Sequence, residues 1–181
     1  TKHQAVNFAS LMLAIYALGL DLEMAAYFMQ NVKPYGGRGL TTIHEINGIN
    51  FQIIDDAYNA NPASMSAAFL SLDNFKGEKI AILGDMRELG EQAPQMHKNL
   101  KPYIIQSGIK KVFLVGEMMK YLHEYIKDDI ESHHFMSVNK DVFSEIFNMI
   151  KNQDLTILVK GSNITLVRGF VDYIADIAKG S

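Results

Sequence analysis

Short runs of β-forming residues alternate with helical stretches along most of this chain, and that alternation constrains the fold more than any other feature. The runs are rich in Ile, Val, Leu and Phe and are predicted as strands at 40–46, 49–54, 79–83, 111–115, 134–137 and 155–159. The intervening patterns predict helices at 62–74, 91–106, 118–127, 140–151 and 165–179. Strands joined through helices pair in parallel with right-handed crossovers. We therefore expect an α/β fold with a mostly parallel sheet and helices on both faces.

The beginning of the chain follows a different pattern. Helices are predicted at 5–18 and 22–31, with Asp21 capping the second, and Pro34–Gly37 is the predicted linker. Two helices cannot enclose a core, so their apolar faces need cover from another part of the protein. The chain also starts inside a helical pattern without Met, from which we expect a fragment. Beyond the linker, Asn47-Gly48 predicts a hairpin turn between the first two strands.

Composition excludes several classes of partner. The 181 residues carry a net charge of -3, which gives no electrostatic case for binding nucleic acid or an anionic membrane. There is no cysteine, so disulfides and cysteine–zinc sites are excluded, and a cytoplasmic location is expected. No apolar run reaches transmembrane length.

His133 and His134 are adjacent on a predicted strand and point to opposite faces of the sheet, so we expect no metal there.

Polar and glycine-rich segments follow four of the predicted strands. They are Asp55–Asn61, Gly84–Gly90, Gly116-Glu117 and Lys160–Ser162. The carboxyl ends of parallel strands lie along one edge of a sheet, where such folds bind ligands. We therefore expect these segments to form one site. Neither a GxxxxGK[ST] phosphate loop nor a GxGxxG dinucleotide motif occurs in the chain.

Taken alone, each residue of this edge also has an ordinary structural explanation. Asp55 and Asp56 fit a solvated strand end about as well as a binding site, and Arg38 fits an exposed charge in a linker. Asn61 before Pro62 fits a helix N-cap. His97 lies within a predicted helix, where a half-buried structural histidine is the simplest interpretation. Spacing alone therefore predicts a site but no reaction.

Five segments in order resemble the Mur ligase family. DDAYNANPASM at 55–65 resembles the family's DDSYNANP, and GDMRELG at 84–90, followed by His97, resembles its GDMxELG. The other three are HQAVN at 3–7, Gly37-Arg38 and KGS at 160–162, which resemble HNxxN, GR and KGS. The resemblance covers nearly the whole chain. It implies that residues 1–34 end a central ATP-binding domain and that 35–181 form the C-terminal Rossmann-like domain.

The resemblance also implies a reaction. The family member with these motifs adds D-alanyl-D-alanine to UDP-N-acetylmuramoyl-tripeptide through an acyl phosphate, in bacterial cell-wall synthesis. ATP and Mg²⁺ would be bound mainly by the part of the protein that carries the phosphate loop. Because that loop is absent here, these residues alone are expected to be inactive. Two alternatives remain open: a non-catalytic Rossmann-like nucleotide- or peptide-binding module, and another Mur or folylpolyglutamate-type ligase.

Site roles follow from the same resemblance. The residues implied to contact the nucleotide are Asn7, Arg38, Asp56, Asn59 and Asn61. Those implied to contact the other substrates are Tyr58, Asp85, Glu88, Lys160 and Ser162. No catalytic residue or metal ligand is assigned within this chain. Three departures stand out: Gln4 replaces the family's first Asn, Ala57 replaces a common Ser, and no Arg follows Ser162.

Overall fold

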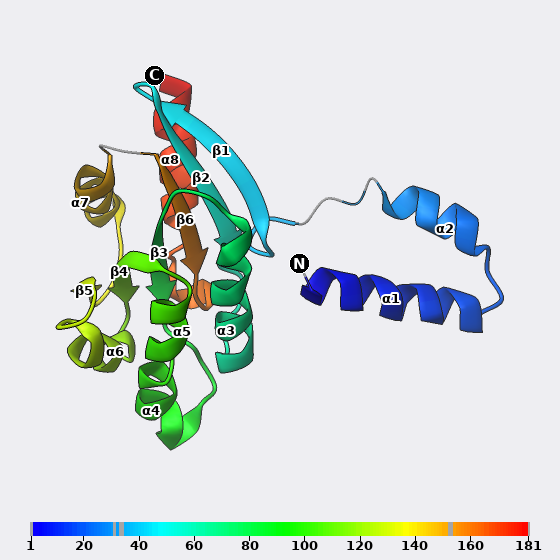
Figure 1. Cartoon of the computed structure of the whole chain (residues 1–181), viewed down its shortest axis with the longest axis horizontal. Coiled ribbons are helices and arrows are strands. Elements are labelled where there is room, and N and C mark those ends of the chain that lie inside the picture. Colours follow the sequence, from blue (N-terminus) through cyan, green and yellow to red (C-terminus); the bar gives the residue numbers. More distant parts are fainter. Residues whose placement is uncertain (1, 31, 33–34, 152–153, 181) are drawn as a thin grey trace. The chain divides into compact units, whose positions relative to one another are not determined.

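A computed structural model describes residues 2–30, 32, 35–151 and 154–180 of the chain. It divides into two compact units, Thr1–Pro34 and Tyr35–Ser181 (Figure 1). The first contains the predicted helices as α1 (Lys2–Ala17) and α2 (Leu22–Met29). The Asp21 carboxylate accepts a hydrogen bond of 2.9 Å from the Met24 N–H, which confirms the predicted cap.

Apolar side chains of this first unit face solvent. None of those described there is buried, and the exposed ones include Phe8, Leu13, Tyr16 and Phe28. The expected end of α2 at residue 31 and Pro34 of the expected linker lie outside the described residues. Two helices thus pair without making a core, as the sequence predicts.

The second unit is built on a six-stranded sheet. Its strands are β1 (Leu40–Ile46), β2 (Ile49–Asp56), β3 (Glu78–Gly84), β4 (Ile109–Val115), β5 (Glu131–Phe135) and β6 (Leu155–Lys160). Their order is β1-β2-β6-β3-β4-β5, in which only β1 and β2 pair antiparallel. Asn47 and Gly48 join that pair at φ values of 53° and 76°, the positive angles that an Asn-Gly turn requires. The predicted mostly parallel sheet is confirmed.

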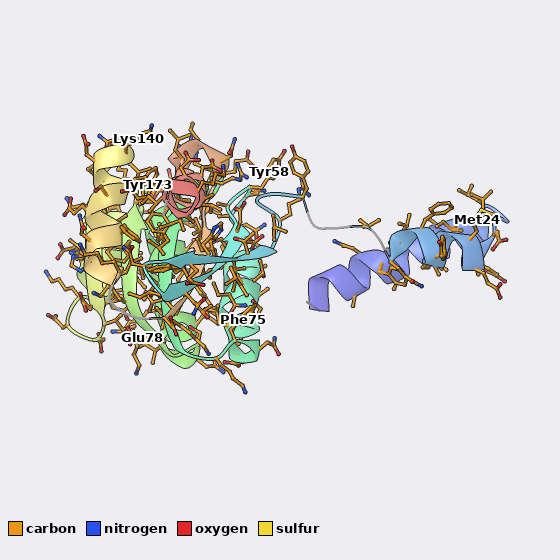
Figure 2. The ribbon with its side chains drawn as sticks, turned by 90° about the horizontal axis from the view of Figure 1, so that it is seen from above. Met24, Tyr58, Phe75, Glu78, Lys140 and Tyr173 are labelled. Carbon is orange, nitrogen blue, oxygen red and sulfur yellow. The ribbon has the colours of Figure 1, made fainter. Side chains whose placement is uncertain are left out.

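Helices cover both faces of the sheet (Figure 1). They are α3 (Pro62–Ser71), α4 (Ala93–Lys98), α5 (Lys101–Gln106), α6 (Met119–Ile126), α7 (Lys140–Ile150) and α8 (Gly169–Gly180). Successive strand residues point to opposite faces, so Ile53 packs in the cluster with α7 and α8, and Ile54 in the cluster with α3, α5 and α6. Figure 2 shows Tyr173 and Phe75 on these opposite sides of the sheet.

Several predicted boundaries differ from the structure, and three of the differences have identifiable reasons. The helix expected at 91–106 is split into α4 and α5, because Pro102 lacks an N–H and its ring clashes with the carbonyl four residues earlier. The strand expected at 134–137 is β5, which begins at Glu131 because it pairs with β4 from Lys111 onward. The last helix begins at Gly169 because Leu166 adopts a left-handed φ of 56°, which no α-helix can contain.

Among the described residues, no helix is long and apolar enough to span a membrane.

Removing the α3 cap tests the turn that carries the central motif. Asn61 Oδ1 accepts from the Ser64 N–H at 2.8 Å, and Ser64 Oγ accepts from the Asn61 N–H at 3.1 Å. We expect Asn61→Ala to lower the free energy of unfolding by about 1 kcal/mol, measured by urea titration followed by circular dichroism. Asn148→Ala, on the exposed face inside α7, is the matched control and should be neutral or slightly stabilising. Equal effects of both substitutions would contradict a capping role.

Candidate functional site

The loops that follow β2, β3, β4 and β6 are joined to one another at the carboxyl edge of the sheet. The Ser162 N–H donates to the Asp85 carbonyl at 3.1 Å, which links the loops after β6 and β3. The Asp85 carboxylate in turn accepts from the N–H groups of Met118 and Met119 at 3.2 and 2.8 Å, which links them to the start of α6. The Lys160 ammonium donates to the Asn59 carbonyl, 101 positions away, which links the loop after β2 to the same edge, so the structure brings together the segments that the sequence predicts there.

Asp55 is the buried anchor of this edge. Its carboxylate accepts from the Gly37 N–H at 2.8 Å and from Arg168 Nε at 3.0 Å, while its carbonyl accepts from the Gly39 N–H at 2.8 Å. The side chain is 1% exposed, so these donors replace water around the charge. Asp55 thus ties the segment after the linker and the start of α8 to the end of β2.

Asp56 and Lys160 form the second charged pair. Lys160 Nζ lies 2.7 Å from Asp56 Oδ2, and the two residues face each other in the parallel register of β2 and β6. The side chains are 29% and 2% exposed respectively, so Asp56 reaches solvent and Lys160 does not. Lys160 Nζ also donates to the carbonyls of Asn59 and Asp56, at 3.1 and 3.4 Å.

Arg38 and Tyr58 lie in contact with each other, and Tyr58 follows Asp56 by two residues. The Arg38 guanidinium carbon is 4.4 Å from the centre of the Tyr58 ring, a cation–π contact. The Tyr58 N–H donates to the Gly37 carbonyl at 3.0 Å, which fixes the two segments to each other. Tyr58 is half-exposed and Arg38 is exposed. A guanidinium held on an aromatic face at the edge of the site is suited to binding phosphate oxygens.

The two asparagines of the motif have local partners. Asn59 Oδ1 accepts from the Ala60 N–H at 2.8 Å, and Asn61 caps α3. Asn7 is exposed on α1 in the first unit. Glu88 is exposed with a left-handed φ of 62°, which turns the chain between β3 and α4.

His97 is a structural histidine, as the sequence predicts, but it is fully buried and not half-buried. Its Nε2 accepts from the Met86 N–H at 3.0 Å, and its Nδ1 lies 2.6 Å from the Ala93 carbonyl. These partners assign the neutral tautomer with the proton on Nδ1. Burial lowers the pKa of His97 below its ordinary value of 6.5, although the Ala93 carbonyl and the Asp85 carboxylate act in the opposite direction. His97 therefore holds the loop after β3 in place.

The loops after β3 and β6 approach too closely for side chains. A Cβ on Gly161 would lie 2.7 Å from Gly84 Cα, and a Cβ on Gly84 would clash with the Thr165 side chain. Thr165 Oγ1 donates to the Ser162 carbonyl at 2.6 Å. Ser162 is buried, and its Oγ has no hydrogen-bond partner among the described residues. Both glycines are therefore required by packing.

The role of Arg168 could not be found from spacing. The sequence departs from the family's KGSR between Asn163 and Arg168, and the structure turns the Arg168 side chain onto Asp55 and, at 3.7 Å, onto Asp172. The only signal in the sequence was Asp55, an acid at the end of a predicted buried strand that would need a cation as its partner.

Surface pockets of about 510 and 410 Å³ lie between α7 and α8, and the smaller one reaches Asn163 and Arg168. Among the described residues, no three His, Asp or Glu side chains gather to hold a metal ion.

Comparisons with known proteins agree on one family. A family profile described as "Mur ligase, glutamate ligase domain" matches residues 40–163. The chain is 35% identical over 173 residues to the UDP-N-acetylmuramoyl-tripeptide–D-alanyl-D-alanine ligase of Rickettsia prowazekii, covering 95% of this chain and 37% of that relative. The enzyme of the same name from Bacillus subtilis is 32% identical over 167 residues, with 89% and 35% covered.

Solved structures give the same result. A crystal structure of MurF from Acinetobacter baumannii is similar with a TM-score of 0.77 and 26% identity, over 98% of this chain and 38% of that one. MurF from Thermotoga maritima, in complex with ADP, has a TM-score of 0.74 at 19% identity over 98% of this chain and 39% of that one, which shows a shared fold. The chain spans little more than a third of the length of these proteins.

The lowered pKa of His97 predicts a pH dependence of stability. As pH falls below 6.5, the unfolded chain takes up a proton at this residue before the folded protein does, so the free energy of unfolding decreases. Above pH 6.5 the histidine is neutral in both states, and its contribution to stability is then fully present. In an NMR titration, the imidazole should remain mostly neutral at pH 6.5. His97→Leu identifies the signal, and should cost about 1–3 kcal/mol at neutral pH because the Met86 N–H loses its acceptor. Half-protonation of His97 at or above pH 6.5 would contradict this account.

Proposed function

This chain belongs to the Mur ligase family, and from that membership we propose that the complete protein joins D-alanyl-D-alanine to UDP-N-acetylmuramoyl-tripeptide at the expense of ATP. The observation that carries the proposal is the identity of 35% to a ligase of that name along 95% of this chain. Its counterpart in the structure is the convergence of all four motif-bearing loops at one edge of the sheet. A bacterial cytoplasmic location is part of the same proposal.

The proposed reaction proceeds by transfer of a phosphoryl group. The terminal carboxylate of the tripeptide takes the γ-phosphoryl group of ATP and becomes an acyl phosphate. The amine of D-alanyl-D-alanine then attacks the carbonyl carbon, and phosphate leaves with the electrons of the broken C–O bond. Such a step needs cations around the transferring group and a site closed to water.

The chain would supply one side of that site. Arg38 offers a planar guanidinium for phosphate oxygens, and Asp56 offers the partly exposed carboxylate for the nucleotide. Tyr58 and Glu88 are exposed at the same edge and remain proposed contacts for the other substrates. Asn7 is a proposed nucleotide contact from the first unit, which we propose to be the end of the central ATP-binding domain. Mg²⁺ would be held mainly by residues outside this chain.

Some implied contacts already have structural partners. Asp85 accepts two backbone hydrogen bonds at the start of α6, and Asn61 caps α3. Asn59 accepts from the neighbouring Ala60 N–H, and Ser162 donates its backbone N–H to the Asp85 carbonyl, while its buried Oγ is unpaired among the described residues. We propose that these four residues shape the site and that any contact they make with ligand is through atoms not used in these bonds.

Ligase activity of the complete gene product is the direct test. With ATP, Mg²⁺, UDP-N-acetylmuramoyl-tripeptide and D-alanyl-D-alanine we expect formation of the amide product, detected by mass. The 181-residue chain alone, given all four, should release no phosphate above background because it has no phosphate loop. Product formed with glutamate instead of D-alanyl-D-alanine would favour another Mur or folylpolyglutamate-type ligase. Absence of product with any amino acceptor would favour a binding module.

The role of Arg38 gives a sharper prediction. Arg38→Lys keeps the charge but loses the two parallel N–H donors that suit a phosphate group. In the complete protein we expect the KM for ATP to rise about tenfold, since hydrogen bonds to charged groups contribute about 1.5–3 kcal/mol. Lys120→Arg, on helix α6, is the control and should leave KM unchanged. An unchanged KM for ATP in Arg38→Lys would remove Arg38 from the nucleotide site.

A further inference from the structure

Lys160 is a charged residue in the interior of the protein. It is the last residue of β6, the strand between β2 and β3, and its side chain is only 2% exposed. A buried ammonium is stable only when acceptors replace the water it has lost. Three oxygens do so here: Asp56 Oδ2 at 2.7 Å, the Asn59 carbonyl at 3.1 Å and the Asp56 carbonyl at 3.4 Å.

Those three acceptors match the three N–H donors of the ammonium. An acceptor-substrate contact by Lys160, which the family resemblance implies, would require giving up one of these bonds from a buried position. The carboxylate of Asp56, at 29% exposure, is the member of the pair that a ligand can reach. The charged pair therefore presents Asp56 to the site and keeps Lys160 behind it.

The same bonds fix the loop that begins the central motif. Lys160 holds the backbone at Asp56 and at Asn59, on either side of Tyr58. Tyr58 in turn contacts the Arg38 guanidinium and the Gly37 carbonyl. One buried side chain thus sets the position of both proposed nucleotide contacts, Asp56 directly and Arg38 through Tyr58.

We propose that Lys160 is a positioning residue for the nucleotide side of the site and makes no contact with the acceptor substrate. The inference rests on the proposed function only in taking Asp56 and Arg38 as nucleotide contacts. Lys160 holds the Asp56 carboxylate and the 56–59 loop in the geometry that ATP meets, so its loss loosens nucleotide binding and leaves the acceptor site as it is.

The experiment uses the complete protein and two separate readouts. The Kd for ADP is measured by calorimetry, and the KM for D-alanyl-D-alanine is measured at saturating ATP. We expect Lys160→Met to weaken ADP binding about tenfold, which corresponds to about 1.4 kcal/mol, and to change the KM for D-alanyl-D-alanine by less than twofold. Lys101→Met is the matched control, because Lys101 makes an ion pair of the same 2.7 Å length with Asp129 on the surface, and it should change neither value.

A double-mutant cycle separates positioning from independent contacts. Asp56→Asn and the Lys160→Met/Asp56→Asn double variant are measured in the same way. If Lys160 acts through Asp56, the double variant should bind ADP more tightly than the product of the two single effects predicts. Multiplicative effects would overturn the proposal, as would a raised KM for D-alanyl-D-alanine with an unchanged Kd for ADP.

Stability and function are kept apart by two further measurements. Thermal unfolding of each variant reports the folded fraction, and Lys160→Arg, which keeps a charge for Asp56, should recover at least part of the ADP affinity even if Lys160→Met folds poorly. A loss of folded protein with normal ADP binding by the remainder would mean a purely structural lysine and would overturn the proposal. ADP binding can be measured without turnover. A wild-type protein that binds ADP but forms no product with D-alanyl-D-alanine would therefore refute the proposed function alone. A wild-type protein that binds no ADP would refute both the proposed function and the positioning role of Lys160.

Discussion

The buried carboxylate of Asp55 needs donors in place of water, and the elements around the carboxyl edge of the sheet are arranged to supply them. Gly37 provides a backbone N–H from the segment that enters the second unit, and Arg168 provides Nε from the residue before α8. An unpaired charge at 1% exposure would cost several kcal/mol. One carboxylate therefore ties the segment that enters the domain to the residue that precedes its last helix.

The two acids at the end of β2 divide their tasks because adjacent strand residues point to opposite faces of a sheet. Asp55 pairs with Arg168 and belongs to the scaffold, whereas Asp56 pairs with Lys160 and remains partly open to solvent. Each acid has its own cation, so the two negative charges can lie next to each other in sequence without sharing a partner. The motif DDAYNANP combines an anchor, a proposed ligand contact and a helix cap within eight residues.

Local rules were enough to predict most of the fold. The Asn-Gly turn, the Asn61-Pro62 helix start and the strand–helix alternation depend on neighbours in sequence, and each is present in the structure. Errors arose where a partner far along the chain decides the outcome, as for β5, whose start is set by pairing with β4. One error was local, since Pro102 separates α4 from α5 within the helix expected at 91–106.

For the site, the sequence predicted which loops meet but not which polar atoms are already bonded. The contacts of Asp85 with α6 and of Lys160 with the 56–59 loop join residues more than 30 positions apart, beyond the reach of any spacing rule. The contact between Gly84 and Gly161 has a further consequence for engineering. Neither position accepts even a methyl group without displacing backbone or Thr165, so the loops after β3 and β6 are packed too closely at this point to take a side chain. If Tyr58 and Glu88 contact the acceptor substrate as proposed, these exposed side chains can be varied to change specificity, whereas the two glycines cannot.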